Sequence, residues 1–512
     1  MKQNADDSTL PSPSSAWLLR LMLVLLFAAG ITLRLKCLAC KPFWFDESFS
    51  AEVARLDWSN FLHLMWWREA NMSLYYVLLR AWMLFGQSEF FIRALSVALA
   101  AATLPAIYWL ARQLYDRRVA WIATALLTFN AYHVRYAQEA RSYSLFVLLA
   151  TLSSGFLIAF LRQPSRRNRL AFILFSVLAV YSHFYALLLV AAQWIAVRQL
   201  PSFDDHKDSV LAAQLRRAWI SIGLAVLPLL IFVAKTGAGP IRWIARPGIH
   251  DMLAFFTHLT GGYAWPLPVL YALACVVALA PVGTKLWTRG RSSDQRSDQS
   301  WEVWRCQFLS LWLAFPIVLT VLLSFIRPVF LGRYMIFCLP PLVILAAAGL
   351  SRLRQSWMLA GVLTAILILS SQGILFVYGH DFDNERDASG EAANFILTNA
   401  LPGDAIVFHI ADTRVAYEFF RSQRAGENTG PDILFPHHAD TLDYRDFTGK
   451  PTAELLRKAG PPQTRIWLML MNNHQGGSAD STTGMITQTL SESFPTMQRW
   501  QFMKVEIRLY SR

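Results

Sequence analysis

Residues 17–35 read WLLRLMLVLLFAAGITLRL, and the chain then reads FDES at residues 45–48. An apolar run of this length can cross a bilayer as one helix. It is too long for the core of a signal peptide and lacks a small-residue cleavage site, so we expect an uncleaved anchor. Asp46 and Glu47 should then lie in the first loop beyond the membrane. A carboxylate pair at that depth indicates chemistry or ion pairing.

The composition predicts a polytopic membrane protein, because 55% of the 512 residues are hydrophobic and only 16% are charged. Apolar runs predict about eleven spans. Their centres lie near residues 26, 102, 126, 151, 176, 191, 227, 274, 316, 342 and 367. The clusters of Arg and Lys fall in alternate loops, which the positive-inside rule places in the cytoplasm. We therefore expect a cytoplasmic N-terminus.

The formal charge of +13 is explained mostly by this topology. The natural partner of these loops is the lipid bilayer with its anionic lipids. The basic residues are spread over many loops and form no stripe, which argues against nucleic acid. A bacterial inner membrane is the favoured location, since no endoplasmic-reticulum retention signal is present.

The chain divides into three predicted parts: a cytoplasmic tail (1–16), a membrane domain (17–378) whose first outer loop covers 37–90, and an extracytoplasmic α/β domain (379–512). In the first outer loop, amphipathic helices are expected over Trp58–Trp67 and from Leu74 to about Gly86. In the last part, apolar runs shorten to strand length at 405–408, 465–470 and 505–510, with a helix over Thr413–Ser422.

Further polar residues are predicted to gather on the outer face. Glu139, Arg141 and Tyr143 open the fourth span, and Arg333-Tyr334 precedes the tenth. Charges at membrane depth indicate a functional site, although an interfacial Glu–Arg pair could simply cap a span. Arginines beside tyrosines suit a phosphate ligand. Tyr75, His183 and Arg327 are candidate substrate contacts on the same face.

These groups fit glycosyl transfer from a lipid-phosphate sugar. The departing phosphate needs positive charge, which arginine supplies, and a carboxylate such as Asp46 can accept the proton of an attacking hydroxyl. If the acceptor were itself a phosphate, Asp46 would instead orient a substrate. His409, Asp412, His437 and His438 lack a metal-site spacing, so no metal or cofactor is predicted, while a divalent ion stays open. Cys37 and Cys40 could form a disulfide in an oxidising compartment.

Five motifs in order resemble the polyprenyl-phosphate-dependent glycosyltransferases of the class C fold (GT-C). The motifs are Phe45-Asp46-Glu47-Ser48, Leu74-Tyr75-Tyr76, Gln138-Glu139-Ala140-Arg141 with Tyr143, Tyr181-Ser182-His183-Phe184 and Arg333-Tyr334. They are most similar to the protein mannosyltransferase-like branch, which includes the aminoarabinose and galacturonic acid transferases. The resemblance covers about residues 15 to 350.

The resemblance implies that Asp46 is the catalytic carboxylate, supported by Glu47, and that Glu139, Arg141 and Arg333 line the donor pocket. The family's His-Pro-Pro before Leu-Tyr-Tyr is Asn71-Met72-Ser73 here, which leaves the acceptor in doubt: a glycolipid, lipopolysaccharide, polysaccharide or protein. Other classes compete with a transferase. A transporter or flippase for lipid-linked saccharides would carry polar residues in mid-span and often internal repeats. The remaining alternatives are a non-catalytic lipid-binding homologue and a polysaccharide polymerase or lipid-linked oligosaccharide ligase, which would favour a large outer loop between late spans.

Overall fold

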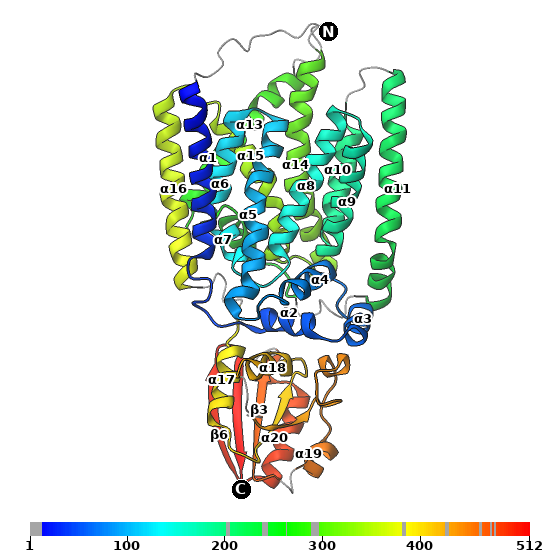
Figure 1. The fold of residues 1–512 in the computed structure, drawn as a ribbon, viewed down its shortest axis with the longest axis vertical. Helices are drawn as coiled ribbons and strands as arrows, with labels where there is room; N and C mark the ends of the chain where they lie inside the picture. The colour runs from blue at the N-terminus through cyan, green and yellow to red at the C-terminus, as the bar shows by residue number, and fades with distance from the viewer. Residues whose placement is uncertain are drawn as a thin grey trace.

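The structure is a computed structural model that describes residues 13–200, 205–237, 244–262, 264–287, 296–380, 386–424, 430–459, 463–471, 474–475 and 478–512. A bundle of long helices stands on a layer of shorter ones, and a small α/β domain lies on the other side of that layer (Figure 1). The polytopic helical fold with a C-terminal α/β domain is therefore confirmed.

Each predicted span centre falls within a helix. These helices are α1 (Pro13–Leu35), α5 (Glu89–Leu114), α6 (Arg117–Thr128), α8 (Tyr143–Arg162), α9 (Arg166–Ser182), α10 (Ala186–Arg198), α11 (Asp205–Thr236), α13 (Pro266–Trp287), α14 (Arg296–Ile326), α15 (Leu339–Leu350) and α16 (Ser356–Gly379). Within the described residues, six helical stretches are long and apolar enough to cross a membrane: 89–114, 143–162, 209–236, 301–326, 332–350 and 356–379. The count of eleven spans is not confirmed, because helices such as α6 and α15, at 12 residues each, extend only about 18 Å.

Burial differs sharply among these helices. The stretch 332–350 is wholly buried, whereas only 28% of the apolar window is buried in α11 and in α16. Exposed apolar side chains on α11, such as Leu224, match a hydrocarbon environment. Inside the bundle α8 packs against α5 so closely that a Cβ on Gly155 would lie 2.2 Å from the Trp109 ring. Gly155 thus leaves room for the Trp109 ring, and small residues at helix contacts are the usual means by which membrane helices pack closely.

Short helices form a layer at the end of the bundle where α1 ends: α2 (Phe45–Arg55), α3 (Trp58–Trp67) and α4 (Ser73–Trp82) (Figure 1). Asp57 caps α3 by accepting hydrogen bonds from the backbone N–H groups of Ser59 and Asn60. The bounds of α3 are those predicted, and α4 ends slightly earlier than predicted. Helix α2 was not predicted. Cys37 and Cys40 form a disulfide within the segment that connects α1 to this layer.

Further short elements complete the membrane domain. They are α7 (Ala131–Ala137), α12 (Ile249–Leu259) and the 3-10 helix η2 (Gly332–Cys338). Helix α7 packs against α8 and α16, and η2 packs against α8, α14 and α15. The turn between α7 and α8 and the start of η2 carry the residues around Arg141 and Arg333.

The C-terminal domain is built on a five-stranded sheet of order β2-β1-β3-β7-β6. Strand β1 (Ala405–His409) pairs in parallel with β2 (Asp432–Phe435) and β3 (Arg465–Met471), while β7 (Val505–Ser511) runs antiparallel to β3 and to β6 (Thr496–Phe502). A second, two-stranded sheet joins β4 (His474–Gln475) and β5 (Ser478–Ala479). The helical elements of this domain are α17 (Ser389–Asn399), α18 (Thr413–Gln423), η4 (Tyr444–Phe447), α19 (Ala453–Ala459) and α20 (Ser481–Ser493).

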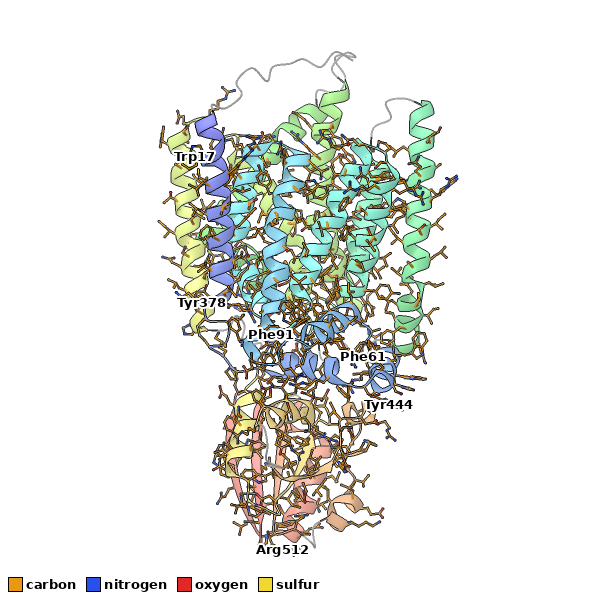
Figure 2. The ribbon with its side chains drawn as sticks, in the orientation of Figure 1. Trp17, Phe61, Phe91, Tyr378, Tyr444 and Arg512 are labelled. Carbon is orange, nitrogen blue, oxygen red and sulfur yellow. A yellow bond between two sulfur atoms is a disulfide. The ribbon has the colours of Figure 1, made fainter. Side chains whose placement is uncertain are left out.

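The α/β domain docks on the layer of short helices through aromatic rings and ion pairs. Helix α18 packs on α2, and the Phe43 and Phe419 rings stack with centroids 4.8 Å apart. Arg68 donates to the Asp412 carboxylate at 2.8 Å across the junction. Figure 2 shows Phe61 and Tyr444 on the two sides of this junction, with Trp17 at the opposite end of the bundle.

Candidate active site

Asp46 lies in the first turn of α2, where the bundle meets the α/β domain, and its side chain is 18% exposed. Its Oδ2 lies 3.6 Å from Arg141 Nη2 and 3.8 Å from Arg333 Nη2. Both separations are ion-pair distances longer than a hydrogen bond, and Oδ2 is buried with no hydrogen-bond partner among the described residues. A carboxylate oxygen is therefore held between two guanidinium groups and can still accept a hydrogen bond.

The two arginines come from distant parts of the chain. Arg141 lies in the turn that leads into α8 and contacts the Asp46 carbonyl at 3.4 Å through Nη1. Arg333 lies in η2, with its guanidinium carbon 5.7 Å from the centroid of the Trp44 ring. An aromatic face stabilises a nearby cation, so Trp44 helps to hold this guanidinium at the site. The structure thus brings together Asp46, Arg141 and Arg333, as the sequence predicts.

Glu47 points into a different environment from Asp46, since adjacent helical residues project in different directions. Its carboxylate is fully buried and accepts hydrogen bonds from Arg93 at 2.7 and 2.6 Å, from Arg386 at 2.5 Å and from the Ala140 N–H at 3.0 Å. Burial alone would raise the pKa of Glu47, but the two arginines and the Ala140 N–H hold that pKa below its usual value. These contacts make Glu47 an anchor of α2, whereas Asp46 faces the site.

Tyr143, Tyr334 and His183 form the aromatic side of the site. The His183 ring centroid lies 4.7 Å from that of Tyr334 and 5.1 Å from that of Phe146. His183 Nδ1 accepts the Tyr185 N–H at 3.2 Å, which places the ring proton on Nε2. His183 Nε2 and the Tyr143 hydroxyl are buried without partners among the described residues. Two donors are therefore available to a bound oxygen ligand.

The other predicted site residues have different surroundings. Glu139 pairs with Arg135 at 3.5 Å, and the Tyr75 hydroxyl bonds Ser96 at 3.1 Å in the core. Arg327 is exposed just after α14 and is joined to Asp46 by no ion pair or hydrogen bond of the described chain. Asn71, at the position where the family's His-Pro-Pro begins, accepts the Phe184 N–H at 3.0 Å and so ties the first outer loop to the His183 corner.

The sequence analysis missed a second carboxylate beside Asp46. Glu69 lies between α3 and α4, is half-buried and accepts a hydrogen bond from the Tyr76 hydroxyl at 3.4 Å. Burial raises the pKa of Glu69 to about 7, Arg141 and Arg68 oppose this rise, and Asp46 adds to it. Its position next to a tryptophan-rich helix was the only signal in the sequence.

The α/β domain contributes to the same region. Burial raises the pKa of Asp412. The Arg68 guanidinium opposes this rise, and the Asp46 carboxylate adds to it. Asp412 Oδ1 is buried with no hydrogen-bond partner in the described part of the chain. In the sequence, Asp412 belongs to a group of residues without a metal-site spacing, and no motif marks Arg386. Among the described residues, no three His, Cys, Asp or Glu side chains are placed to hold a metal ion.

Glu52 on α2 yields a prediction about pH. Burial raises the pKa of Glu52 to about 7, mainly opposed by Arg55, and Glu418 of α18 adds to the rise. A carboxyl group with a raised pKa contributes stability that is full below its unfolded value, about pH 4.5, and is lost as pH rises through about 7. Glu52→Gln should therefore gain stability relative to wild type between pH 5 and pH 8, by up to about 3 kcal/mol.

Thermal unfolding of the detergent-solubilised protein at both pH values measures this difference. Glu454→Gln is the matched control, because Glu454 is exposed and forms an ion pair with Lys458 on its own helix. Parallel curves for wild type and Glu52→Gln would show that the carboxyl group is solvated and would contradict the prediction.

Comparison with known proteins gives no match to any family profile or curated protein. Among solved structures, ArnT from Cupriavidus metallidurans in the apo state matches with a TM-score of 0.60 at 14% identity, over 97% of this chain and 98% of that chain. ArnT bound to undecaprenyl phosphate matches with a TM-score of 0.54 at 14% identity, over 95% and 98%. This chain has the GT-C fold. The apo oligosaccharyltransferase of Archaeoglobus fulgidus matches at 0.50 and 11% identity, over 79% of this chain and 64% of that one.

The GT-C fold confirms the architecture expected from the five motifs. It also agrees with the membrane-length helices, so the chain is a multi-pass membrane protein. Because the identity is only 14%, the structural match shows the fold alone. Any role of the site residues is argued from their geometry.

Proposed function

We propose that this protein is an integral membrane glycosyltransferase that moves a sugar from a polyprenyl-phosphate donor to an acceptor outside the cytoplasm. The observation that carries the proposal is the Asp46 carboxylate held 3.6 and 3.8 Å from two arginines at the boundary between bundle and α/β domain. The ArnT structure with undecaprenyl phosphate supports a polyprenyl phosphate as the lipid. The sugar is a hexose or pentose derivative in this proposal.

In the proposed reaction, Arg141 and Arg333 bind the donor phosphate. A guanidinium carries five N–H donors, so an arginine that shares Asp46 can also bind phosphate oxygens. Tyr143 and His183 Nε2 donate to further donor oxygens, and Tyr334 packs beside them. As the bond between the sugar and the phosphate oxygen breaks, its electron pair goes to the phosphate. The arginines stabilise that charge.

Asp46 Oδ2 acts on the acceptor side. An acceptor hydroxyl attacks the anomeric carbon and passes its proton to this carboxylate oxygen as the new bond forms. The products are the glycosylated acceptor, polyprenyl phosphate and one proton held by Asp46 and then released. The step uses this chain's own residues and no cofactor. Glu47 keeps Asp46 at the site by fixing α2 through Arg93 and Arg386.

The proposed orientation follows from the basic loops. The N-terminus lies in the cytoplasm, and the site and the α/β domain lie on the outer face of a bacterial inner membrane. In this proposal the α/β domain, held at the junction by the Arg68–Asp412 ion pair, lies beside the acceptor's approach to Asp46.

The test is a transfer assay with purified protein in proteoliposomes, given a radiolabelled polyprenyl-phosphate sugar and a membrane extract as acceptor. Label that appears in a glycolipid, polysaccharide or protein fraction supports the transferase and names the acceptor class. Label that crosses the bilayer while still on the donor would establish a flippase, and binding with neither change would establish a non-catalytic homologue. Either result would overturn the proposal.

A further inference from the structure

A large cavity lies between the C-terminal end of α10 and the first half of α11. Figure 1 shows these two helices side by side, and the end of α10 and the start of α11 lie at the end of the bundle opposite the α/β domain. Its volume is about 650 Å³, within the range of sites for organic ligands. It lies apart from Asp46 and its partners, none of which lines it. The proposed transferase mechanism gives it no role.

The walls of this cavity are mostly apolar. Val197 and Leu200 line one side, and Leu211, Leu215 and Ile220 line the other. Two indole rings complete it: Trp194 is 46% exposed, and Trp219 is half-buried. Indole rings favour the boundary between hydrocarbon and head groups, so this cavity has the composition of a site at the membrane interface.

Two arginines give the cavity its charge. Arg198 ends α10 and Arg216 lies on α11, and the described residues that line the cavity include no acidic side chain. The Arg198 guanidinium carbon lies 5.2 Å from the centroid of the Trp194 ring, so this arginine is held at the rim. Two guanidinium groups above apolar walls match a phosphate with hydrocarbon chains attached.

The surroundings favour a lipid over a free ion. Only 28% of the apolar window of α11 is buried, so this helix faces the bilayer along most of its length. An apolar groove that opens to hydrocarbon fills with acyl chains, because water gains nothing there. The arginines then select the head group.

We propose that the cavity between α10 and α11 is a binding site for an anionic phospholipid of the cytoplasmic leaflet. Arg198 and Arg216 bind its phosphate, and its acyl chains lie along the apolar walls between Trp194 and Trp219. The site shares no residue with the glycosyl-transfer proposal, and its placement in the cytoplasmic leaflet rests on the orientation proposed there.

The experiment measures lipid binding to the full-length protein in nanodiscs of phosphatidylcholine, with and without phosphatidylglycerol, by native mass spectrometry after gentle release. The expected result is preferential retention of phosphatidylglycerol by wild type and about tenfold weaker retention by the double variant Arg198→Gln/Arg216→Gln. The matched control is Arg166→Gln/Arg217→Gln, which removes the same charge from exposed arginines outside the cavity.

A second variant distinguishes loss of the lipid site from misfolding. Ala213→Trp keeps both arginines and fills the cavity that Ala213 lines, so it should also lose phosphatidylglycerol retention. Thermal unfolding in phosphatidylcholine alone shows whether each variant folds. Equal losses in the control pair, or retention unchanged in the cavity variants, would overturn the proposal. Displacement of the lipid by millimolar inorganic phosphate would also overturn it, because the site would then recognise the free ion.

Discussion

Glu47→Gln should destabilise the protein by about 3–5 kcal/mol, the largest effect on stability that we expect from one substitution. The amide has no charge to compensate Arg93 and Arg386, which both contact the buried carboxylate, and its NH₂ group would face a guanidinium. Removing one partner of a buried ion pair leaves uncompensated charge in a medium of low dielectric constant. Thermal unfolding in detergent and the yield of folded protein from membranes measure the loss.

Asp46→Asn is the natural control for this prediction, because the neighbouring carboxylate is partly exposed and its arginines lie at longer distances. Its unfolding temperature should stay close to that of wild type. A Glu47→Gln variant as stable as Asp46→Asn would show that Arg93 and Arg386 find other partners, and it would remove the role of anchor from Glu47.

Asp46→Asn should reduce the rate of sugar transfer by about 10²–10⁴-fold while the protein still binds polyprenyl phosphate. The amide keeps the size of the side chain but cannot take the proton of an attacking hydroxyl. Arg141 and Arg333 stay in place, and the loss of the Asp46 charge leaves them more available to a phosphate. Initial rates with a labelled donor and equilibrium binding of the unlabelled lipid phosphate separate the two effects.

Asp440→Asn provides the same chemical change at an exposed position of the α/β domain and should transfer sugar at the wild-type rate. Equal rates for Asp46→Asn and Asp440→Asn would remove Asp46 from the chemistry. A phosphate acceptor, which needs no base, would then be the natural substrate to try.

The sequence predicts the parts of the fold that depend on local pattern. Apolar runs locate the membrane helices, the aromatic spacing of Trp58–Trp67 locates α3, and the short apolar runs at 405–408 and 465–470 locate β1 and β3. Local pattern does not decide whether a helix of 12 residues such as α15 spans the bilayer, because its burial depends on its neighbours. The number of spans therefore could not be predicted as firmly as their positions.

The candidate-site residues that stand in a motif were predictable, and those outside any motif were not. Asp46, Arg141 and Arg333 stand in recognisable motifs and meet in the structure. Glu47 was predicted as a helper of Asp46, and its partners Arg93 and Arg386 have no motif. Burial raises the pKa of Glu69 and of Asp412, and no local sequence pattern indicates this burial.

The bond between Glu47 and Arg386 joins residues 339 positions apart, and it sets an order of events during synthesis. When the first outer loop leaves the ribosome, Arg386 does not yet exist, so the carboxylate of Glu47 has only part of its final compensation. The full set of contacts around Glu47 is therefore complete only after Arg386 has been made. A premature stop before Arg386 would release a chain that has all its membrane helices and lacks one of the two arginines that bind Glu47 of α2.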